Sequence, residues 1–201
     1  MVVVGLTGGI GAGKSTVAAL LRERGAVTVD ADALARAVVD PGGPAYEAVV
    51  SRFGPDVVVA AGGAIDRSRL ATVVFADAGA RADLEAIVHP VVRAGVAERV
   101  AAEAAAGTAV VVVEIPLLVE SPASRAGLEA TVVVDCPEDV AVERLVQDRG
   151  MTEADARARL SAQASRSDRF AIADFVIDNA GGRAALDAEV DRCWKWITGL
   201  H

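Results

Sequence analysis

A glycine-rich segment near the start of the chain has the composition of a phosphate-binding loop. Residues 8–15 read GGIGAGKS, which satisfies the pattern G-x-x-x-x-G-K-[ST] in full. Glycines let the main chain turn tightly around an anion, and a helix that begins near Lys14 adds the positive end of its dipole. In such a loop Lys14 binds the β- and γ-phosphates, Ser15 binds a magnesium ion, and Thr16 can donate to the α-phosphate. The spacing therefore predicts a bound nucleoside triphosphate.

The choice of lysine in this loop supports the same interpretation. Only Lys14 and Lys195 are lysines, in a chain that otherwise uses arginine for its basic residues. The wide guanidinium of arginine does not replace a compact ammonium beside a phosphate. A dinucleotide-binding turn, which also has glycines after a first strand, is disfavoured because its third glycine would fall on Lys14.

Carboxylates that follow the second predicted strand favour a kinase among the classes of protein that have this loop. Motors, GTPases, transporters and small-molecule kinases share the loop, so the loop alone predicts only nucleotide binding. A kinase with a hydroxyl acceptor needs a carboxylate to orient that hydroxyl and accept its proton. Asp32 is suitably placed and Asp30 is its rival, although either could instead cap a helix at Ala33. Arg36 could hold a phosphate of the acceptor or pair with Asp32. The sequence contains no N-K-x-D guanine motif, which argues against a GTPase.

These residues need a sheet that gathers them at one edge. Short apolar and β-branched runs predict five strands, at residues 2–6, 27–29, 109–113, 130–134 and 174–177. Helical periodicity predicts helices at residues 15–24, 33–39, 137–148, 152–165 and 182–197. Strands that alternate with helices favour an α/β fold with a parallel sheet and right-handed crossovers. With the loop after the first strand, we predict a P-loop NTPase with a five-stranded parallel sheet and flanking helices.

The middle of the chain differs from this alternation. Residues 45–108 are alanine-rich and mostly helical in periodicity, so we interpret them as a helical insertion in a single domain that spans residues 1–201. Pro90 is expected to start a new helix or to kink a long one.

Composition excludes several classes of protein. With 28 acidic and 20 basic residues the chain carries a net charge of −8, which argues against nucleic acid as a partner. The longest apolar run, residues 109–119, is broken by Glu114 and is too short for a membrane span. The first residues lack the basic stretch of a secretory signal, and two distant cysteines suggest no disulfide framework. We therefore expect a cytoplasmic protein, as a monomer or weak homo-oligomer.

The motifs taken together resemble the dephospho-CoA kinase family. The resemblance runs in order along nearly the whole chain. It rests on TGGIGAGKST at 7–16, VDAD at 29–32, AR at 35–36, HP at 89–90, PLL at 116–118, and ADFVIDN at 173–179 with Gly181. It implies transfer of the γ-phosphoryl group of ATP to the 3′-hydroxyl of dephospho-CoA with Mg²⁺, the last step of coenzyme A synthesis. It also implies that the insertion forms the acceptor lobe, and we place a candidate lid at about residues 148–165.

The resemblance further implies roles for individual residues. Catalytic roles fall to Asp32, Lys14 and Arg144, and a magnesium ligand to Ser15. Nucleotide contacts fall to Gly9, Gly11, Ala12, Gly13, Lys14, Ser15, Thr16, Arg149, Asn179 and Gly181. Acceptor contacts fall to Thr7, Asp32, Arg36, His89, Pro116, Leu117 and Leu118. The residues alone leave alternatives open, because Arg144 and Arg149 could be solvated helix charges and His89 a hydrogen-bonding residue between helices.

Overall fold

The computed structural model describes residues 1–59 and 63–200 of the chain. These residues form two compact units, which are described separately. Residues 1–30 and 100–200 form the first, here called the sheet unit, and residues 31–99 form the second, here called the helical unit. The insertion expected at residues 45–108 thus overlaps the helical unit, which begins at residue 31 and ends at residue 99.

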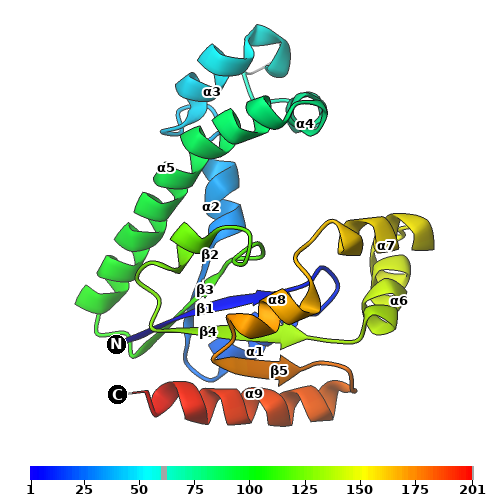
Figure 1. Ribbon diagram of the computed structural model, residues 1–201. Helices are drawn as coiled ribbons and strands as arrows, with labels where there is room; N and C mark the ends of the chain where they lie inside the picture. Colours follow the sequence, from blue (N-terminus) through cyan, green and yellow to red (C-terminus); the bar gives the residue numbers. More distant parts are fainter. Residues whose placement is uncertain (60–62, 201) are drawn as a thin grey trace. The chain divides into compact units, whose positions relative to one another are not determined.

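The sheet unit is built on five parallel strands (Figure 1). They are β1 (Val2–Gly8), β2 (Val27–Asp30), β3 (Val110–Glu114), β4 (Ala130–Asp135) and β5 (Phe175–Asp178). Their order is β2-β3-β1-β4-β5, and every pairing is parallel. The predicted fold class and the five predicted strands are confirmed, with ends that differ by one or two residues.

The register of the strands brings acidic residues to the carboxyl edge of the sheet. Asp30 pairs with Glu114, and Asp135 pairs with Asp178. Gly8, the last residue of β1, lies beside Val134 at the same edge. Ligands of open parallel sheets bind outside this edge, so the register places the start of the glycine-rich loop at the expected position.

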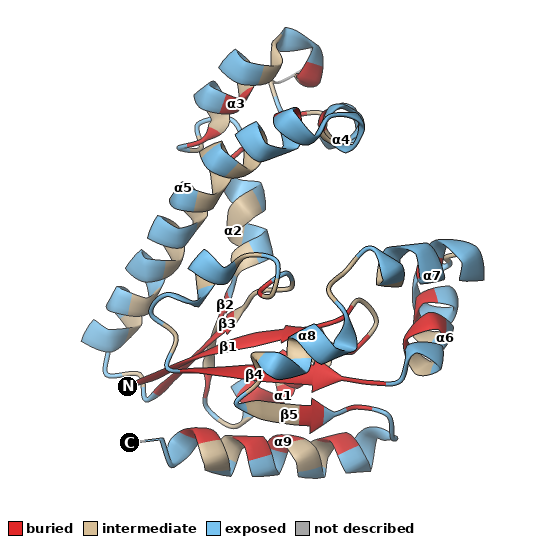
Figure 2. Ribbon diagram, viewed as in Figure 1, coloured by how far each residue is buried: buried red, intermediate tan, exposed pale blue. Residues whose placement is uncertain are grey.

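The helices of the sheet unit are α1 (Lys14–Glu23), α6 (Glu138–Arg149), α7 (Glu153–Ser161), α8 (Arg166–Ala171) and α9 (Arg183–Thr198), with the 3-10 turn η2 (Pro122–Arg125) after β3. Helices α1 and α9 pack on the sheet through apolar faces at helical spacing, whereas α7 packs against α6. Helix α9 buries Leu186, Val190, Cys193 and Ile197, which are three or four residues apart. Figure 2 shows that burial is greatest along the central strands β1 and β4, where the core of this unit lies.

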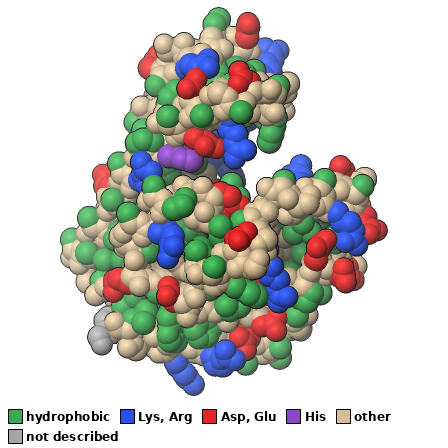
Figure 3. Space-filling model, viewed as in Figure 1, with side chains coloured by type: hydrophobic (Ala, Val, Ile, Leu, Met, Phe, Trp, Pro, Cys, Tyr) green, Lys and Arg blue, Asp and Glu red, His purple; other side chains and the backbone are tan. Residues whose placement is uncertain are grey.

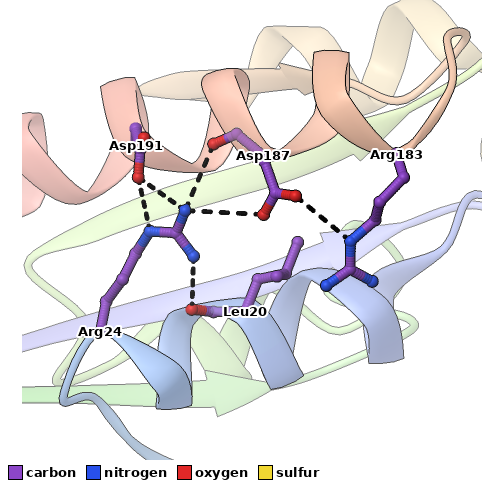
Figure 4. Close-up of polar contacts among 5 residues, drawn as sticks. All are labelled: Leu20, Arg24, Arg183, Asp187 and Asp191. Atoms are coloured by element: carbon purple, nitrogen blue, oxygen red, sulfur yellow. Dashed lines mark hydrogen bonds and ion pairs between the residues drawn. The ribbon is translucent and has the colours of Figure 1, made fainter.

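A polar cluster joins α1 to α9. Arg24, at the carboxyl end of α1, donates from Nε to Asp191 and from Nη1 to the carbonyl of Leu20, 2.9 Å away (Figure 4). Its Nη2 atom lies 2.6 Å from Asp191 and 3.7 Å from Asp187. The Arg24 side chain is only 18% exposed, so solvent screens these contacts less than those of a fully exposed pair.

The helix predicted at residues 152–165 is present as α7 but ends four residues earlier, and helix α8 was not predicted. Helix α7 ends at Ser161, and α8 begins at Arg166 after a turn at residues 162–165. Ser165 caps α8: its Oγ accepts from the amide of Asp168 at 3.1 Å, and the Asp168 carboxylate accepts from the amide of Ser165 at 3.2 Å. This capping box fixes the start of a helix that the sequence analysis did not predict.

The helical unit contains α2 (Ala31–Ala37), α3 (Tyr46–Phe53), a 3-10 turn η1 (Pro55–Val57), α4 (Arg67–Ala76) and α5 (Ala78–Ala105) up to residue 99. Helix α2 begins two residues earlier than predicted, so Asp32 lies in its first turn. Helix α5 continues through Pro90, so proline does not start a new helix there. Within the described parts of the chain, none of the helices has the length and hydropathy that a membrane span requires.

Candidate active site

The glycine-rich loop connects β1 to α1 in a conformation that depends on glycine at two positions. Gly13 precedes α1 with φ 91° and ψ 25°, in the left-handed region, and Gly11 has φ 77°. A Cβ at Gly13 would collide with Nδ2 of Asn179, and one at Gly11 would lie 2.8 Å from the carbonyl oxygen of Ala141. Both positions therefore exclude larger residues through conformation and through space.

Lys14 places its ammonium group on the loop itself. Its Nζ atom donates to the carbonyl of Gly8 at 2.8 Å and to that of Gly9 at 3.1 Å. Ser15, exposed, and Thr16, half-buried, follow in the first turn of α1. A compact cation and the amino end of a helix are thus brought together, which is the arrangement that binds a terminal phosphate.

Asn179, which directly follows β5, supports the loop through its side chain. It is 5% exposed, its Nδ2 atom donates to the carbonyl of Ala12 at 2.8 Å, and its main-chain N–H donates to the carbonyl of Asp135 at 2.7 Å. Gly181, also predicted to contact the nucleotide, is exposed in the segment between β5 and α9. The Asn179 side chain is therefore engaged in holding the loop.

Arg144 brings a second cation to the loop. Its Nη2 atom donates to the carbonyl of Asn179 at 2.9 Å, and a Cβ at Gly13 would lie 3.9 Å from its Nη1 atom. That Nη1 atom is buried and has no hydrogen-bond partner among residues 1–59 and 63–200. A buried charged donor without a partner is costly, so this atom suits an anionic ligand beside the loop. Arg149, by contrast, is exposed at the end of α6.

A cavity of about 360 Å³ lies on one side of the loop. It is lined by the loop, the end of β4, the start of α6, the turn before α8 and α8 itself. Its polar lining includes Gln163, which lies within the predicted lid, and Arg166 and Arg169, which the sequence analysis did not single out. Cys136 also lines it, and burial raises the pKa of its thiol, which keeps that group neutral.

Arg166 neutralises an acid at the end of β4. Its Nε and Nη2 atoms both donate to Asp135, with a shortest distance of 2.6 Å, and Asp135 is 5% exposed. The hydrogen bond to Asp135 raises the pKa of Arg166, and the neighbouring negative charge adds to that shift. A bidentate pair of this kind fixes α8 against the sheet and removes a negative charge from beside the loop.

The geometry of the loop is matched by similarity to known proteins. The sequence model of the dephospho-CoA kinase family matches residues 2–185. The chain belongs to the dephospho-CoA kinase family. It is 49% identical over 195 residues to the dephospho-CoA kinase of Thermobifida fusca, covering 97% of this chain and 96% of the relative. It is 51% identical over 199 residues to that of Anaeromyxobacter dehalogenans, covering 99% and 93%.

The chain is also similar to solved structures. The dephospho-CoA kinase from Campylobacter jejuni superposes with a TM-score of 0.73 and 28% identity, covering 98% of this chain and 96% of that one. TT1252 from Thermus thermophilus gives a TM-score of 0.85 with 34% identity, covering 98% of each chain. A shikimate kinase from Bacteroides thetaiotaomicron, at a TM-score of 0.52 and 17% identity, shares the fold.

The residues predicted for the acceptor divide between the two units. In the sheet unit, Thr7 is buried and its Oγ1 donates to the carbonyl of Pro116 at 3.2 Å. Leu118 is fully buried, whereas Leu117 is 46% exposed. In the helical unit, Asp32 and Arg36 are exposed on α2, and His89 is half-buried in α5. Asp30, the alternative to Asp32, is the last residue of β2 in the sheet unit.

Gln163 was predicted only as part of the lid, and Arg166 and Arg169 were not predicted, because their contacts join segments that are distant in the chain. Gln163 accepts a hydrogen bond from the amide of Ile10, 153 residues away in sequence. A local signal did exist for the two arginines, because Arg166 and Arg169 share one helix face three residues apart after a capping serine. No pattern in the sequence indicates that they face the glycine-rich loop.

Proposed function

We propose that this chain transfers the γ-phosphoryl group of ATP to the 3′-hydroxyl of dephospho-CoA, which yields CoA and ADP. The single structural observation that carries the proposal is the glycine-rich loop with Lys14 on it and, beside it, the buried Nη1 atom of Arg144, which has no hydrogen-bond partner among the described residues. Membership of the dephospho-CoA kinase family supports the acceptor. This reaction is the last step of coenzyme A synthesis.

On the nucleotide side, the main-chain amides of the loop bind the phosphates. The ring is made by Gly9, Gly11, Ala12, Gly13, Lys14, Ser15 and Thr16. Lys14 and Arg144 neutralise the charge that develops on the transferring group, and Arg149 and Gly181 contact the nucleotide from the edges of the site. Asn179 contributes by holding Ala12 in place. Two fixed cations beside a ring of amides account for stabilisation of the triphosphate.

The donor set also fits a magnesium ion. Ser15 presents an exposed hydroxyl at the first turn of α1, next to the lysine of the loop. Mg²⁺ prefers oxygen ligands and is usually held by one or two protein oxygens together with substrate phosphates and water. Ser15 would hold the ion, which would supply charge neutralisation to the phosphates when bound.

On the acceptor side, we assign the general base to Asp32, with Asp30 as the alternative. The base orients the 3′-hydroxyl and accepts its proton as the new P–O bond forms. Arg36, His89, Pro116 and Leu117 provide acceptor contacts. Thr7 and Leu118 shape that region through packing, as their burial suggests. The acceptor lobe, about residues 45–108, and the lid, about residues 148–165, complete the proposed enzyme within one domain.

The substrate assignment is tested by acceptor-dependent formation of ADP. A coupled assay across dephospho-CoA, AMP, CMP and shikimate separates this reaction from those of other small-molecule kinases. We expect dephospho-CoA to give the highest kcat/KM by at least about 100-fold, the size of discrimination that a few lost contacts produce. Equal or better turnover of another acceptor would overturn the assignment.

We also propose that the enzyme acts in the cytoplasm, as a monomer or a weak homo-oligomer. Two buried free thiols, Cys136 and Cys193, support a reducing compartment. Burial raises the pKa of Cys193 to about 12, so this thiol stays neutral and packs as an apolar group.

A further inference from the structure

The turn between α7 and α8 is tied directly to the phosphate loop. The amide of Ile10, the third residue of the GGIGAGKS loop, donates to Oε1 of Gln163 at 2.8 Å. Because only the oxygen of the Gln163 side chain can accept a hydrogen bond from a main-chain N–H, this bond fixes which way the side-chain amide of Gln163 is turned. Gln163 also lines the cavity that Gly9 and Ile10 line.

The next residue, Ala164, is held at both of its main-chain polar groups. Its N–H donates to Oε1 of Glu120 at 2.9 Å, and its carbonyl accepts from Nη1 of Arg169 at 2.6 Å. The same guanidinium lies alongside the loop, because a Cβ at Gly9 would be 3.4 Å from its Nη2 atom. Two adjacent residues of the turn thus join the phosphate loop, the segment after β3, and α8.

These contacts are of a kind that an exposed turn does not need. Main-chain groups of a surface turn are satisfied by water at little cost, so the contacts of Ala164 with the side chains of Glu120 and Arg169 are not required for stability. What they do is fix the position of the turn against the loop. Arg166, clamped to Asp135, anchors the other end of the same segment. The turn therefore cannot leave the loop without breaking the bond at Ile10.

We propose that Gln163 is a positioning residue for phosphoryl transfer, which holds the Ile10 amide and keeps the α7–α8 turn closed over the phosphate loop while Glu120 holds the turn from the other side. This inference rests on the kinase reaction proposed above. A closed turn excludes water from the loop. Without it, water competes with the acceptor hydroxyl: its oxygen bonds to the γ-phosphorus, the bond to the ADP oxygen breaks, and ADP, phosphate and a proton are released.

The first test compares the only two glutamines of the chain. In Gln163→Ala we expect the ratio of ATP hydrolysed to dephospho-CoA phosphorylated to rise about five-fold, which is the effect of one hydrogen bond. Gln147→Ala is the matched control, because Gln147 is exposed and its side chain donates to Glu143 on its own helix. A hydrolysis ratio in Gln163→Ala equal to that of Gln147→Ala would overturn the proposal.

A second measurement needs neither nucleotide nor turnover. Hydrogen exchange of the Ile10 amide, followed by NMR in the free protein, should be faster in Gln163→Ala and unchanged in Gln147→Ala. Unaltered exchange at Ile10 in Gln163→Ala would contradict the bond on which the inference depends.

Glu120 offers a test that leaves Gln163 intact. Glu120→Ala removes the acceptor for the Ala164 amide and should raise the hydrolysis ratio, whereas Glu120→Gln keeps an oxygen there and should restore the normal ratio. Equal ratios in the two variants would overturn the role of Glu120. Failure of the proposed function is distinguishable, since the unaltered enzyme would then form no ADP in response to dephospho-CoA.

Discussion

In the sheet unit every residue of β1 and β4 is buried, whereas in the helical unit α2 buries none of its residues and α3 and α4 bury one each, Val49 and Leu70. The first unit holds its phosphate loop between a fully buried strand and a helix. The second unit has a thin core, and its charged pairs, such as Arg52 with Asp83, lie at the surface. Burial on this scale makes the position of a strand end far less adjustable than that of an exposed helix.

This difference suggests a division of labour. The phosphates of ATP are the same whatever the acceptor, and a rigid ring of main-chain amides suits them. The acceptor residues proposed on α2 and α5 are side chains on a less deeply packed unit. We therefore expect changes in the phosphate loop of the sheet unit to act on ATP and changes on α2 of the helical unit to act on the acceptor step.

The largest effect is expected for Lys14→Ala in the sheet unit. Removal of the ammonium group leaves the developing charge of the transferring phosphoryl uncompensated, so kcat should fall by about 1,000-fold. Steady-state ADP formation measures this. Lys195→Ala is the control, because Lys195 is the only other lysine and is exposed on α9; a comparable loss in that variant would contradict the assignment.

The division between the units is tested next by Asp32→Asn. Loss of the general base should lower kcat by about 100-fold, while ATP affinity measured by calorimetry stays within about two-fold. Asp30→Asn is the companion variant on the sheet side. Normal turnover in Asp32→Asn with a loss in Asp30→Asn would move the base to the sheet unit and break the comparison.

A smaller effect, confined to nucleotide binding, is expected for Gly13→Ala. The new Cβ would collide with Asn179 at a left-handed φ, so the loop must distort and ATP affinity should fall by about tenfold. Gly25→Ala is matched to it, because Gly25 has φ 104° but nothing within 4 Å of its Cβ position. That variant should lose about 1 kcal/mol of unfolding free energy and bind ATP normally.

The smallest effect is expected away from both sites. Arg24→Ala removes the contacts between α1 and α9 and should lower the free energy of unfolding by about 1 kcal/mol without changing kcat. Arg183→Ala breaks a pair with Asp187 on the same helix in which the Arg183 side chain is 60% exposed, and it should cost less than about 0.5 kcal/mol in urea unfolding. A larger loss of unfolding free energy in Arg183→Ala than in Arg24→Ala would show that the more buried contact is not the more stabilising one.

Ion pairs on the surface also differ in whether the sequence can predict them. Acidic and basic side chains lie side by side over α6 and α7 (Figure 3), where Arg157 pairs with Glu153 one turn before it and with Glu138 on α6. The first pair is visible as i,i+4 spacing in the sequence, and the second is not. The same distinction applies to the candidate site.

The loop, the strands and the fold class could be predicted because each has a local cause. Glycines at fixed offsets allow one backbone path, and β-branched runs favour buried strands. Helix α8, which starts at the capping box of Ser165, was not predicted. Gln163 was placed only within the predicted lid and Arg166 was not singled out, since their partners Ile10 and Asp135 are 153 and 31 residues away.

The amino-acid sequence by itself determined the phosphate loop, the five-stranded parallel sheet and membership of a kinase family, because short-range stereochemistry and spacing encode them. Only the tertiary structure decided that Asn179 braces the loop, that Arg144 keeps a buried donor beside it, and that Gln163 closes a turn upon it. These facts depend on strand register and helix packing, which bring together side chains that no local pattern connects.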